Sequence, residues 1–560
     1  MISSSTWVPR GFASEFPEQY ELDDAEMERI NQLASLELSD ARDDLAEAEA
    51  DQSDDKPASA ALSSTLEIDD DLKAYDLENY DNDTSEGQEV TMFPGLSSEV
   101  QYHEGEEGND PYLSLPNQTD EAEEKAENQI YPTDNLVLAT RTEDEISFLD
   151  VYVYDDGAGA PVGAQEEDGD FDNDGMAPGM VREPTLYVHH DIMLPAFPLC
   201  VEWVNYRPGK SVVDESNPNI GNFAAIGTMD PQIEIWNLDC VDKAFPDVIL
   251  GQPQPGQKKK KKKGKGHVTT HHTDAVLSLA HNRVHRSVLA STSADHTVKL
   301  WDLNTADCVR SFCDIHGGAT VSSSQWHPSE AQILLTGGYD GKVAVSDVRM
   351  ADESQSTKQY KIGNGQEIES VRWGSSPELF YAGTDGGNVY CFDVRDQKKP
   401  LWTLHAHDAS ISSMDVNPHI PGMLITSAMG EKVVKLWKCS QGTPSMVISR
   451  DFGIGNVLTS SFAPDIEVAG CAVVGGVTGD LKLWDVLTNS GVRRTFRDEV
   501  SQMQQRAREE AQTVGKPSRM ARKYQGEVSE VLMSVEAGGD DDESDADEGD
   551  VGGDDIEEDQ

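Results

Sequence analysis

The chain has 560 residues, and its 44 Lys and Arg against 103 Asp and Glu give a formal net charge of −59. The acids concentrate at the two ends: residues 1–191 hold 51 acids and 8 bases, and residues 540–560 hold 13 acids and no base. Segments this acidic and this poor in apolar residues cannot bury enough surface to offset the entropy of ordering, which excludes a single compact globule. The nearly neutral middle, roughly 350 residues, is long enough for a full core.

The first twenty residues carry aromatic side chains in a short stretch that also contains Pro and Gly. Exposed aromatics in an extended segment are typical of a docking peptide that orders on a partner, and packing back onto the chain's own domain is the alternative. On the docking interpretation, truncating the tryptophan should barely change thermal stability. The predicted docking residues are Trp7, Pro9, Arg10, Phe12, Phe16 and Tyr20. Residues 23–34 follow with apolar side chains at helical spacing, which predicts a short helix.

Further along, residues 135–156 alternate apolar and polar side chains in the manner of two β-strands, and residues 185–194 read as a third strand. Between them, residues 157–181 are rich in Gly, Asp and Glu. We expect this stretch to be a loop inserted between two strands.

The strongest signal is an internal repeat. Four strand-like segments end at Trp236, Trp301, Trp437 and Trp484, and Ser346 and Phe392 stand at the same register in two more. From Trp301 onward the intervals are 45, 46, 45 and 47 residues. A period of ~40–45 residues with a terminal Trp-Asp pair is typical of WD-repeat β-propellers, in which each repeat forms one four-stranded blade.

The best-preserved repeat offers a hydrogen-bonded set of polar side chains. In such a blade a buried Trp, a strand hydroxyl, a turn Asp and a His from the preceding loop satisfy one another, which makes their burial tolerable. Trp301, Ser291, Asp295 and either His271 or His272 can supply this set. A structural role is favoured over metal ligation because no second ligand lies at metal-binding spacing.

Other repeats depart from this pattern. Asp230 and Asp340 keep the turn acid, whereas Glu431, Gly386 and Thr478 replace it, and Ser346 and Phe392 replace the tryptophan. We expect the departing blades to depend on apolar packing instead of the polar set.

Six repeats begin at Trp236, and the three strands upstream supply a divergent seventh. The sequence therefore predicts an all-β, seven-bladed WD-repeat propeller with short helical segments and disordered acidic extensions. The predicted boundaries are an N-terminal extension over 1–90, the propeller over 91–496 with inserted loops at 157–181 and 243–266, a basic helical extension over 497–537 and an acidic tail over 538–560.

The interval from Trp236 to Trp301 is 65 residues, and the excess falls on a lysine-rich insert. Clustered lysines suit a nuclear import receptor or the phosphate backbone of RNA, and a solvated loop without either role is the alternative. A homopolymer cannot read bases. The lysines are Lys258, Lys259, Lys260, Lys261, Lys262, Lys263 and Lys265.

Beyond the last repeat the chain becomes locally basic, and Val528, Val531, Leu532 and Val535 recur at helical spacing. Arg519, Arg522 and Lys523 belong to this stretch and are candidates to contact RNA or a ribosomal surface, with a merely solvated helix as the alternative. The acidic tail contains Ser544, which suits an acid-directed kinase and predicts a phosphoprotein.

Several classes of protein are disfavoured. The seven cysteines show no CxxC or Cys/His metal pattern, which suggests a reducing compartment, and no phosphate loop or serine elbow is present. No apolar run reaches the ~20 residues that span a bilayer. The sequence thus predicts a soluble intracellular protein with no catalytic residues, metal or cofactor.

Family-specific segments surround the repeats. The start MISSSTWVPRGFASEFPEQYELDDAEMERINQLA, the strands LVLATRTEDEISFLDVYVYDD, the stretch YVHHDIMLPAFPLCVEWV and the repeat TMDPQIEIWNLDCVD resemble the periodic tryptophan protein 1 family. The resemblance implies a nuclear and nucleolar scaffold that acts in large-subunit ribosome biogenesis and rRNA processing. Its implied partners are other large-subunit assembly factors, ribosomal proteins and pre-rRNA, with no membrane.

Two other functions stay open. The acidic flanks favour a dedicated chaperone of a basic ribosomal protein, and WD-repeat propellers can also bind histone tails on chromatin. Recovery of a one-to-one complex without rRNA would identify the chaperone, and recovery with nucleosomes would identify the histone-binding protein.

Overall fold

The computed structural model describes residues 1–20, 128–157, 184–209, 219–252, 267–350, 352–439, 442–514, 518–521, 523–524 and 532–535. Met27, Ile30 and Lys125 are described as single helical residues. The chain falls into two units, Met1–Tyr20 with Glu127–Gln560, and Glu21–Ala126. The predicted helix over 23–34 and the predicted loop over 157–181 fall almost wholly outside the described residues, and the lysine run and Ser544 fall wholly outside them.

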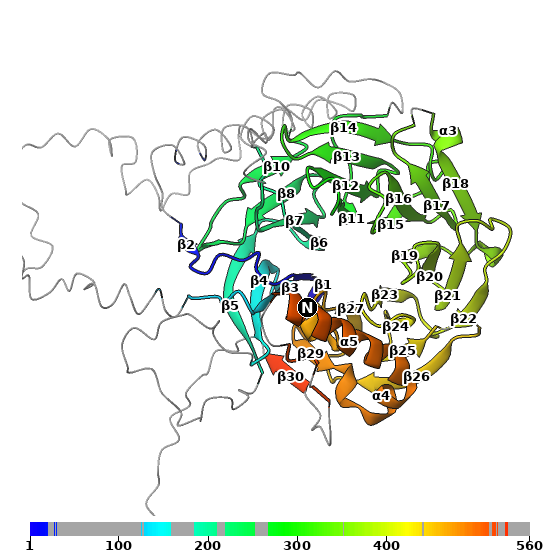
Figure 1. The fold of residues 1–560 in the computed structure, drawn as a ribbon. Helices are drawn as coiled ribbons and strands as arrows, with labels where there is room; N and C mark the ends of the chain where they lie inside the picture. The colour runs from blue at the N-terminus through cyan, green and yellow to red at the C-terminus, as the bar shows by residue number, and fades with distance from the viewer. Residues whose placement is uncertain are drawn as a thin grey trace, which may run out of the picture. The chain divides into compact units, whose positions relative to one another are not determined.

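The first unit forms a ring of seven four-stranded antiparallel sheets around a central channel, which confirms the predicted propeller (Figure 1). In each blade the strands run in chain order from the channel to the rim. Blade 1 has β1 (Ile2–Val8), β3 (Asn135–Glu143), β4 (Ile146–Asp155) and β5 (Thr185–Leu194). Blade 2 has β6 (Pro198–Val204), β7 (Phe223–Thr228), β8 (Ile233–Asn237) and β10 (Val248–Leu250). Blade 3 has β11 (Val276–His281), β12 (Val288–Ser293), β13 (Val298–Asp302) and β14 (Asp307–Phe312).

The remaining four blades follow the same plan. Blade 4 has β15 (Val321–Trp326), β16 (Ile333–Gly338), β17 (Lys342–Asp347) and β18 (Thr357–Lys361). Blade 5 has β19 (Ile368–Trp373), β20 (Leu379–Thr384), β21 (Asn388–Asp393) and β22 (Trp402–His405). Blade 6 has β23 (Ile411–Val416), β24 (Met423–Ala428), β25 (Val433–Lys438) and β26 (Ser445–Asp451). Blade 7 has β27 (Val457–Phe462), β28 (Cys471–Gly476), β29 (Leu481–Asp485) and β30 (Leu532–Val535).

The hydrophobic core lies between the blades. Each of its seven clusters joins residues of two neighbouring sheets, for example Leu289 of blade 3 with Ile235 of blade 2. The middle strands β7, β12, β24 and β28 are buried on both faces, so they read as nearly continuous apolar or small residues. The ring therefore stabilises itself through sheet-to-sheet contacts that must continue all the way round.

The N-terminal segment corrects one prediction. Residues 2–8 are not part of a separate extension: β1 is the innermost strand of blade 1, and Trp7 pairs with Val137 of β3. The chain then leaves the channel and crosses to the outside of the ring, where β2 (Glu18–Gln19) pairs in parallel with β9 (Cys240–Val241); residues 1–20 follow this path in blue (Figure 1). Residues 1–20 of the predicted extension over 1–90 therefore belong to the propeller unit.

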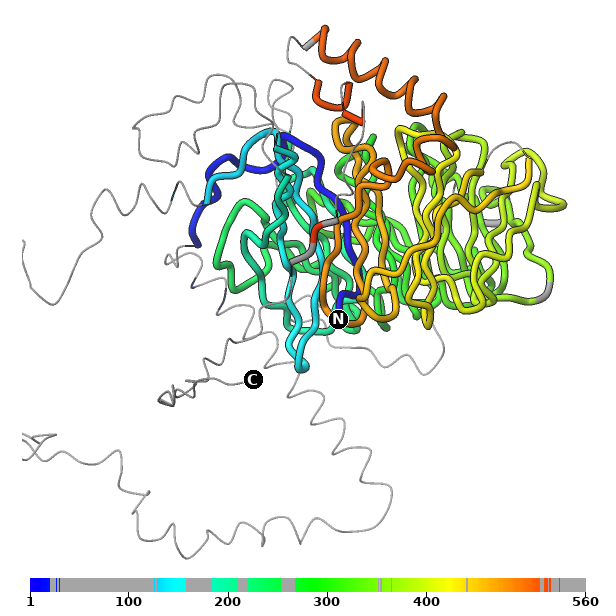
Figure 2. The backbone as a smooth tube through the Cα atoms, turned by 90° about the horizontal axis from the view of Figure 1, so that it is seen from below, coloured from blue at the N-terminus to red at the C-terminus, as the bar shows by residue number. Residues whose placement is uncertain are grey.

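The C-terminal segment corrects a second prediction. After the short helix α4 (Ser490–Thr495), α5 (Arg497–Val514) packs Val500, Met503 and Ala507 into the core cluster of blades 6 and 7. Residues 532–535 then form strand β30 at the outer edge of blade 7, although their spacing predicts a helix. Pairing with β29 overrides the local periodicity, and the propeller extends past residue 496. Figure 2 shows α5 lying across one face of the ring, opposite the face at which the chain begins.

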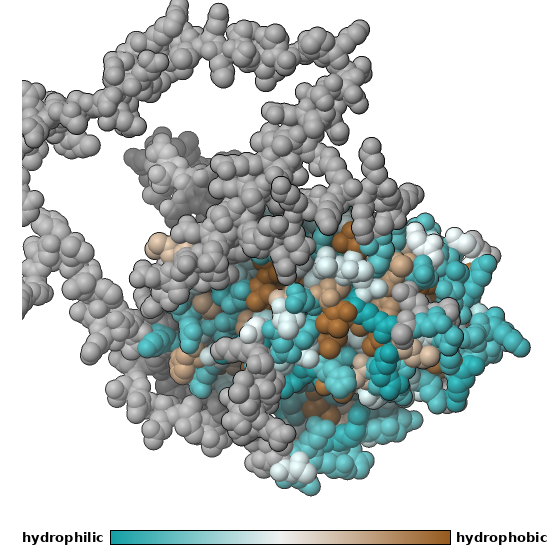
Figure 3. Space-filling view, turned by 90° about the horizontal axis from the view of Figure 1, so that it is seen from above, coloured by the Kyte–Doolittle hydropathy of each residue, from teal (hydrophilic) through white to brown (hydrophobic). Residues whose placement is uncertain are grey.

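One inserted loop is shorter than predicted. Strand β10 (Val248–Leu250) lies inside the predicted loop over 243–266 and pairs with β8 as the outer strand of blade 2. The minor elements are α3 (Glu353–Ser356) and the 3-10 turns η4 (Gly363–Gly365), η5 (Ile466–Val468) and η6 (Val486–Thr488). No helix in the described part of the chain has the length and apolar character needed to cross a bilayer. The side of the ring in Figure 3 is largely hydrophilic, with separate apolar spots.

Candidate functional site

The polar side chains of blade 3 form one continuous hydrogen-bonded chain. The Trp301 indole donates to Ser291 Oγ (2.8 Å), which lies 2.7 Å from His272 Nε2, and His272 Nδ1 lies 2.9 Å from Asp295 Oδ2. Burial lowers the pKa of His272. For Asp295, burial acts to raise the pKa, but the hydrogen bonds from His272 and neighbouring donors outweigh it and hold the pKa well below the ordinary value. A neutral His272 therefore donates to an ionised Asp295.

This arrangement has the order of a hydrolytic Ser-His-Asp triad, yet its chemistry is structural. Ser291 and His272 are both 0% exposed, so no substrate reaches the serine. The serine oxygen already accepts the indole N–H of Trp301, whereas a nucleophile needs that oxygen free. Of the two candidate histidines, His272 holds this position, and the Nδ1 atom of neighbouring His271 lies 2.9 Å from Thr270 Oγ1 instead.

Two departing blades keep the polar set, against expectation. In blade 6 the Trp437 indole donates to Thr426 Oγ1 (2.9 Å), His407 Nε2 lies 2.9 Å from the same hydroxyl, and His407 Nδ1 reaches Glu431 at 2.7 Å. Glutamate fills the role of aspartate because the longer side chain still reaches the buried imidazole. Blade 4 retains His316 with Thr336 and Asp340 although Ser346 replaces the tryptophan.

Blade 5 combines apolar packing with a different polar set, in which Gln366 Oε1 accepts from Thr384 Oγ1 (3.2 Å) and Asn388 Nδ2 (3.1 Å), and blade 7 depends on apolar packing as expected. In blade 5, Phe392 stacks on Phe380 with ring centroids 5.4 Å apart, and Tyr360 packs against both. In blade 7, Trp484 packs on Phe452, and its indole N–H meets no acceptor among the described residues.

Blade 2 keeps Asp230 but does not use it. The Trp236 indole donates instead to Glu234 Oε2 (3.0 Å), and burial raises the pKa of Glu234 to about 7. The turn acid that the sequence retains is exposed to solvent there.

Most of the predicted docking residues pack within the propeller itself, which corrects their assignment to a partner-binding peptide. Trp7 is 5% exposed and donates its indole N–H to Ser461 O of blade 7 (3.2 Å). Phe12 packs edge-on against Trp203 at 4.8 Å, and Tyr20 N donates to Val241 O (3.2 Å). Phe16, with 49% of its surface exposed, is the aromatic of this set that stays accessible. Pro9 leads out of β1.

Arg10, a predicted docking residue, belongs to the seam between blades 1 and 7. Its guanidinium donates to Asp156 Oδ2 (2.9 Å) and to Asn135 Oδ1 (2.7 Å). Its backbone N–H donates to Asp465 Oδ2 (3.0 Å). Asn135 is fully buried, so loss of the Arg10 guanidinium would leave its amide oxygen unpaired and weaken the seam.

Two basic residues expected to contact RNA also belong to that seam, which corrects the prediction. Lys523 Nζ lies 2.9 Å from Asp485 Oδ2, and Tyr524 OH donates to the same carboxylate at 2.6 Å. Arg519 lies 3.7 Å from Asp156. Asp485 and Asp156 are buried, so these cations are partners of internal carboxylates rather than free for phosphate. Arg522 lies outside the described residues.

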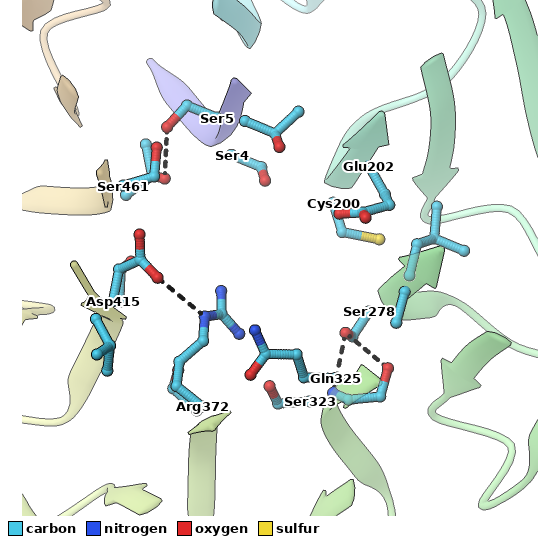
Figure 4. Close-up of a pocket in the computed structure, with 18 of the residues that line it drawn as sticks. Ser4, Ser5, Cys200, Glu202, Ser278, Ser323, Gln325, Arg372, Asp415 and Ser461 are labelled. Carbon is cyan, nitrogen blue, oxygen red and sulfur yellow. Dashed lines mark hydrogen bonds and ion pairs between the residues drawn. The ribbon is translucent and has the colours of Figure 1, made fainter. Parts of the chain in front are cut away.

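The channel is a polar cavity of about 640 Å³, lined by the seven innermost strands (Figure 4). Side chains of one strand bond the backbone of the next: Ser323 Oγ accepts from Val371 N (3.2 Å), Gln325 Oε1 from Trp373 N (2.7 Å) and Asp415 Oδ2 from Phe462 N (2.8 Å). Arg372 points across the channel wall and reaches Asp415 at 3.7 Å. The serine-rich lining therefore holds the blades in register.

A second tryptophan series, missed in the sequence, serves the same purpose. Trp326 donates to Ala280 O (2.9 Å) and Trp373 to Gln325 O (3.3 Å), each across a blade boundary, just as Trp7 does. Their signal is the interval of 47 residues between Trp326 and Trp373, which matches the repeat period.

No three His, Cys, Asp or Glu side chains gather in a metal-binding group in the part of the chain that the structure describes. All seven cysteines are free thiols, and burial raises the pKa of Cys200, Cys391, Cys439 and Cys471 to about 12, which keeps them unreactive.

The chain is similar to known proteins over nearly its whole length. A family model described as the N-terminal domain of nucleolar protein 10-like proteins matches residues 261–465. Periodic tryptophan protein 1 of Saccharomyces cerevisiae is 57% identical over 97% of this chain and 98% of its own length. The Drosophila melanogaster homolog of that protein is 31% identical over 88% of this chain and 96% of its own. A ribosome biogenesis protein WDR12 homolog of Aedes aegypti is 25% identical over 34% of this chain and 43% of its own.

Proposed function

Because the chain belongs to the periodic tryptophan protein 1 family, we propose that it is a non-enzymatic scaffold in the assembly of the large ribosomal subunit, located in the nucleus and nucleolus. The observation that carries the proposal is the 57% identity with the yeast protein across nearly the full length of both chains. A partial match to a protein named for ribosome biogenesis supports the same process.

The geometry suits a platform. The ring is closed on itself, its polar histidines and serines are engaged in structural bonds, and its loops present two separate faces to partners. Many moderate contacts on one rigid body give high avidity without a deep pocket. Assembly factors, ribosomal proteins and pre-rRNA are the partners that this function requires.

The lysine run over 258–265 is the remaining candidate for an RNA contact or a nuclear import signal. It lies outside the described residues, between Gln252 and His267 on the connection from blade 2 to blade 3. Clustered ammonium groups release counterions from a phosphate backbone, so an RNA contact of this kind weakens steeply as salt rises.

Depletion of the protein tests the proposal. Large subunits should fall relative to small subunits, and unprocessed large-subunit rRNA precursors should accumulate. Purification of the tagged chain with and without RNase should recover assembly factors and pre-rRNA. A one-to-one complex with a basic ribosomal protein that lacks rRNA would favour the chaperone function, and recovery with nucleosomes while rRNA processing stays intact would favour histone binding.

A further inference from the structure

Because the strands of each blade are antiparallel, successive connections emerge alternately on the two faces of the ring. In every blade the turn between the second and third strands lies on the face opposite α5, as do the described residues that lead from the fourth strand of blades 1 to 6 into the next blade (Figure 2). We call this the turn face. Its described residues are 144–145, 195–197, 229–232, 251–252, 267–275, 294–297, 313–320, 339–341, 362–367, 385–387, 406–410, 429–432, 452–456 and 477–480.

Large apolar side chains recur at one position of the turn face. The first residue after the second strand is Met229 in blade 2, Tyr339 in blade 4, Met429 in blade 6 and Val477 in blade 7, with 59%, 37%, 59% and 47% of their surfaces exposed. Ile146, beside the corresponding turn of blade 1, is 48% exposed. A hairpin turn needs no apolar side chain for its own geometry, so the repetition around the ring marks a surface that another molecule covers.

The turn face is also strongly acidic. Its described residues include twelve carboxylates against a single Lys or Arg, Lys432, and six histidines. The carboxylates are Asp144, Glu145, Asp230, Asp274, Asp295, Asp314, Asp340, Glu367, Asp385, Asp408, Glu431 and Asp480. Asp295, Asp340 and Glu431 are engaged with the blade histidines, and Asp340 and Glu431 also pair with Lys342 and Lys435. The other nine carboxylates are exposed or half-buried at the turns.

Between blades 4 and 5, Glu369 of β19 lies near two carboxylates of the turn face, Glu367 and Asp385. Burial, then the nearby Glu367 and Asp385, raise the pKa of Glu369. Tyr339 donates its hydroxyl to Glu369 at 3.2 Å, so this tyrosine joins the apolar positions to the acidic ones. An aromatic ring with a polar tip is a frequent anchor in protein interfaces.

We propose that the turn face binds a basic polypeptide segment of a partner protein, in which Lys or Arg alternate with apolar side chains. Only such a segment satisfies both features, because the cations pair with the carboxylates while the apolar side chains cover the exposed Met, Tyr and Val. RNA and a second copy of this face are both repelled by its charge. The chain's own lysine run offers charge without any apolar side chain.

This partner class goes beyond the proposed function, and its test does not depend on ribosome assembly. The full-length protein is titrated into a fluorescent peptide of alternating Arg and Leu, and binding is followed by anisotropy. An all-lysine peptide of equal charge and a single-stranded RNA of equal length serve as comparison probes. We expect the mixed peptide to bind at least about tenfold more tightly than the lysine peptide. Rising salt should weaken the mixed peptide less, because part of its contact is apolar.

Matched variants locate the surface. Met429→Ser with Val477→Ser removes apolar area, and Glu367→Lys with Asp408→Lys reverses charge; all four side chains are exposed, so unchanged melting curves check the fold. Each pair should weaken the mixed peptide about tenfold or more. The control variants are Val309→Ser on the rim strand β14, and Glu330→Lys with Glu378→Lys on the opposite face, which should leave binding unchanged.

Three results would overturn the proposal. Equal weakening by the control variants would place binding elsewhere. Equal affinity for the lysine and mixed peptides would remove the role of the apolar ring. If deleting residues 258–265 increased the affinity for both peptides alike, the chain's own lysine run would be the occupant of the turn face.

Discussion

Blade 3 and the seam between blades 1 and 7 hold the same ring together in opposite ways. Blade 3 is continuous in sequence, and its buried set joins His272 to Trp301 within thirty residues of chain. The seam brings the start of the chain and its C-terminal segment together: Trp7 of β1 bonds Ser461 of β27, and Arg519 lies 3.7 Å from Asp156 of blade 1. A repeat can fold from local contacts, whereas closure needs contacts that span more than 450 residues.

The largest effect is expected from removing the closing strand. Deletion of residues 1–9 takes the innermost strand from blade 1 and uncovers the core cluster that contains Val137, Val473 and Leu483. We expect loss of cooperative unfolding and aggregation, because an opened ring exposes apolar sheet faces and a free edge. Circular dichroism melting and size-exclusion chromatography measure this. A variant lacking residues 258–265 is the control, and cooperative melting of the 1–9 deletion at the wild-type temperature would contradict the role of β1.

Tryptophan truncations at the two places compare local and closing contacts directly. Trp301→Ala and Trp7→Ala should each lower the free energy of unfolding by about 3–5 kcal/mol, because each leaves a cavity and an unpaired acceptor. Equilibrium unfolding in urea measures both. Phe16→Ala, at the exposed aromatic of the same segment, should change stability by no more than about 0.5 kcal/mol. A Trp7 variant as stable as wild type would return this segment to the docking interpretation.

The comparison also explains what the sequence could predict. The period from Trp301 to Trp484 is local and repeated, so it predicts the blades and the set around Asp295. Trp7 pairs with Val137, 130 residues further along, and Leu532 pairs with Trp484, 48 residues back across the helices α4 and α5. Nothing in the spacing of either strand identifies its partner. For the same reason the sequence predicts that Lys523 is a solvent-exposed cation, whereas in the structure it pairs with Asp485.

The inner ion pair of the seam gives a smaller effect. Asp485→Ala should cost about 3 kcal/mol, because Lys523 and Tyr524 lose their shared carboxylate in a buried place. The exposed pair of Arg349 with Asp347 is the matched control, and Asp347→Ala should cost about 1 kcal/mol or less. Equal costs in urea unfolding would show that the C-terminal segment adds little to closure.

The smallest effect, on the order of 1 kcal/mol, is that blade 3 and the seam between blades 1 and 7 lose stability in different pH ranges. In blade 3 the pKa of His272 and the pKa of Asp295 are both lowered by folding. As pH falls, the histidine and the aspartate are therefore protonated at a higher pH in the unfolded chain than in the folded chain. Stability falls as pH drops below about 6.5 and again below about 4.

At the seam the direction is reversed. The pKa of Lys523 is raised: burial acts to lower it, but the nearby Asp485 outweighs burial. The pKa of Tyr524 is raised by burial and by Asp485. The unfolded chain therefore releases protons first, and stability falls as pH rises above about 10. Melting temperatures across pH should show His272→Gln flattening the acid limb alone and Lys523→Met with Tyr524→Phe flattening the alkaline limb alone. If either variant flattened both limbs, the two places would form a single cooperative unit, and the distinction between local blade and closing seam would fail.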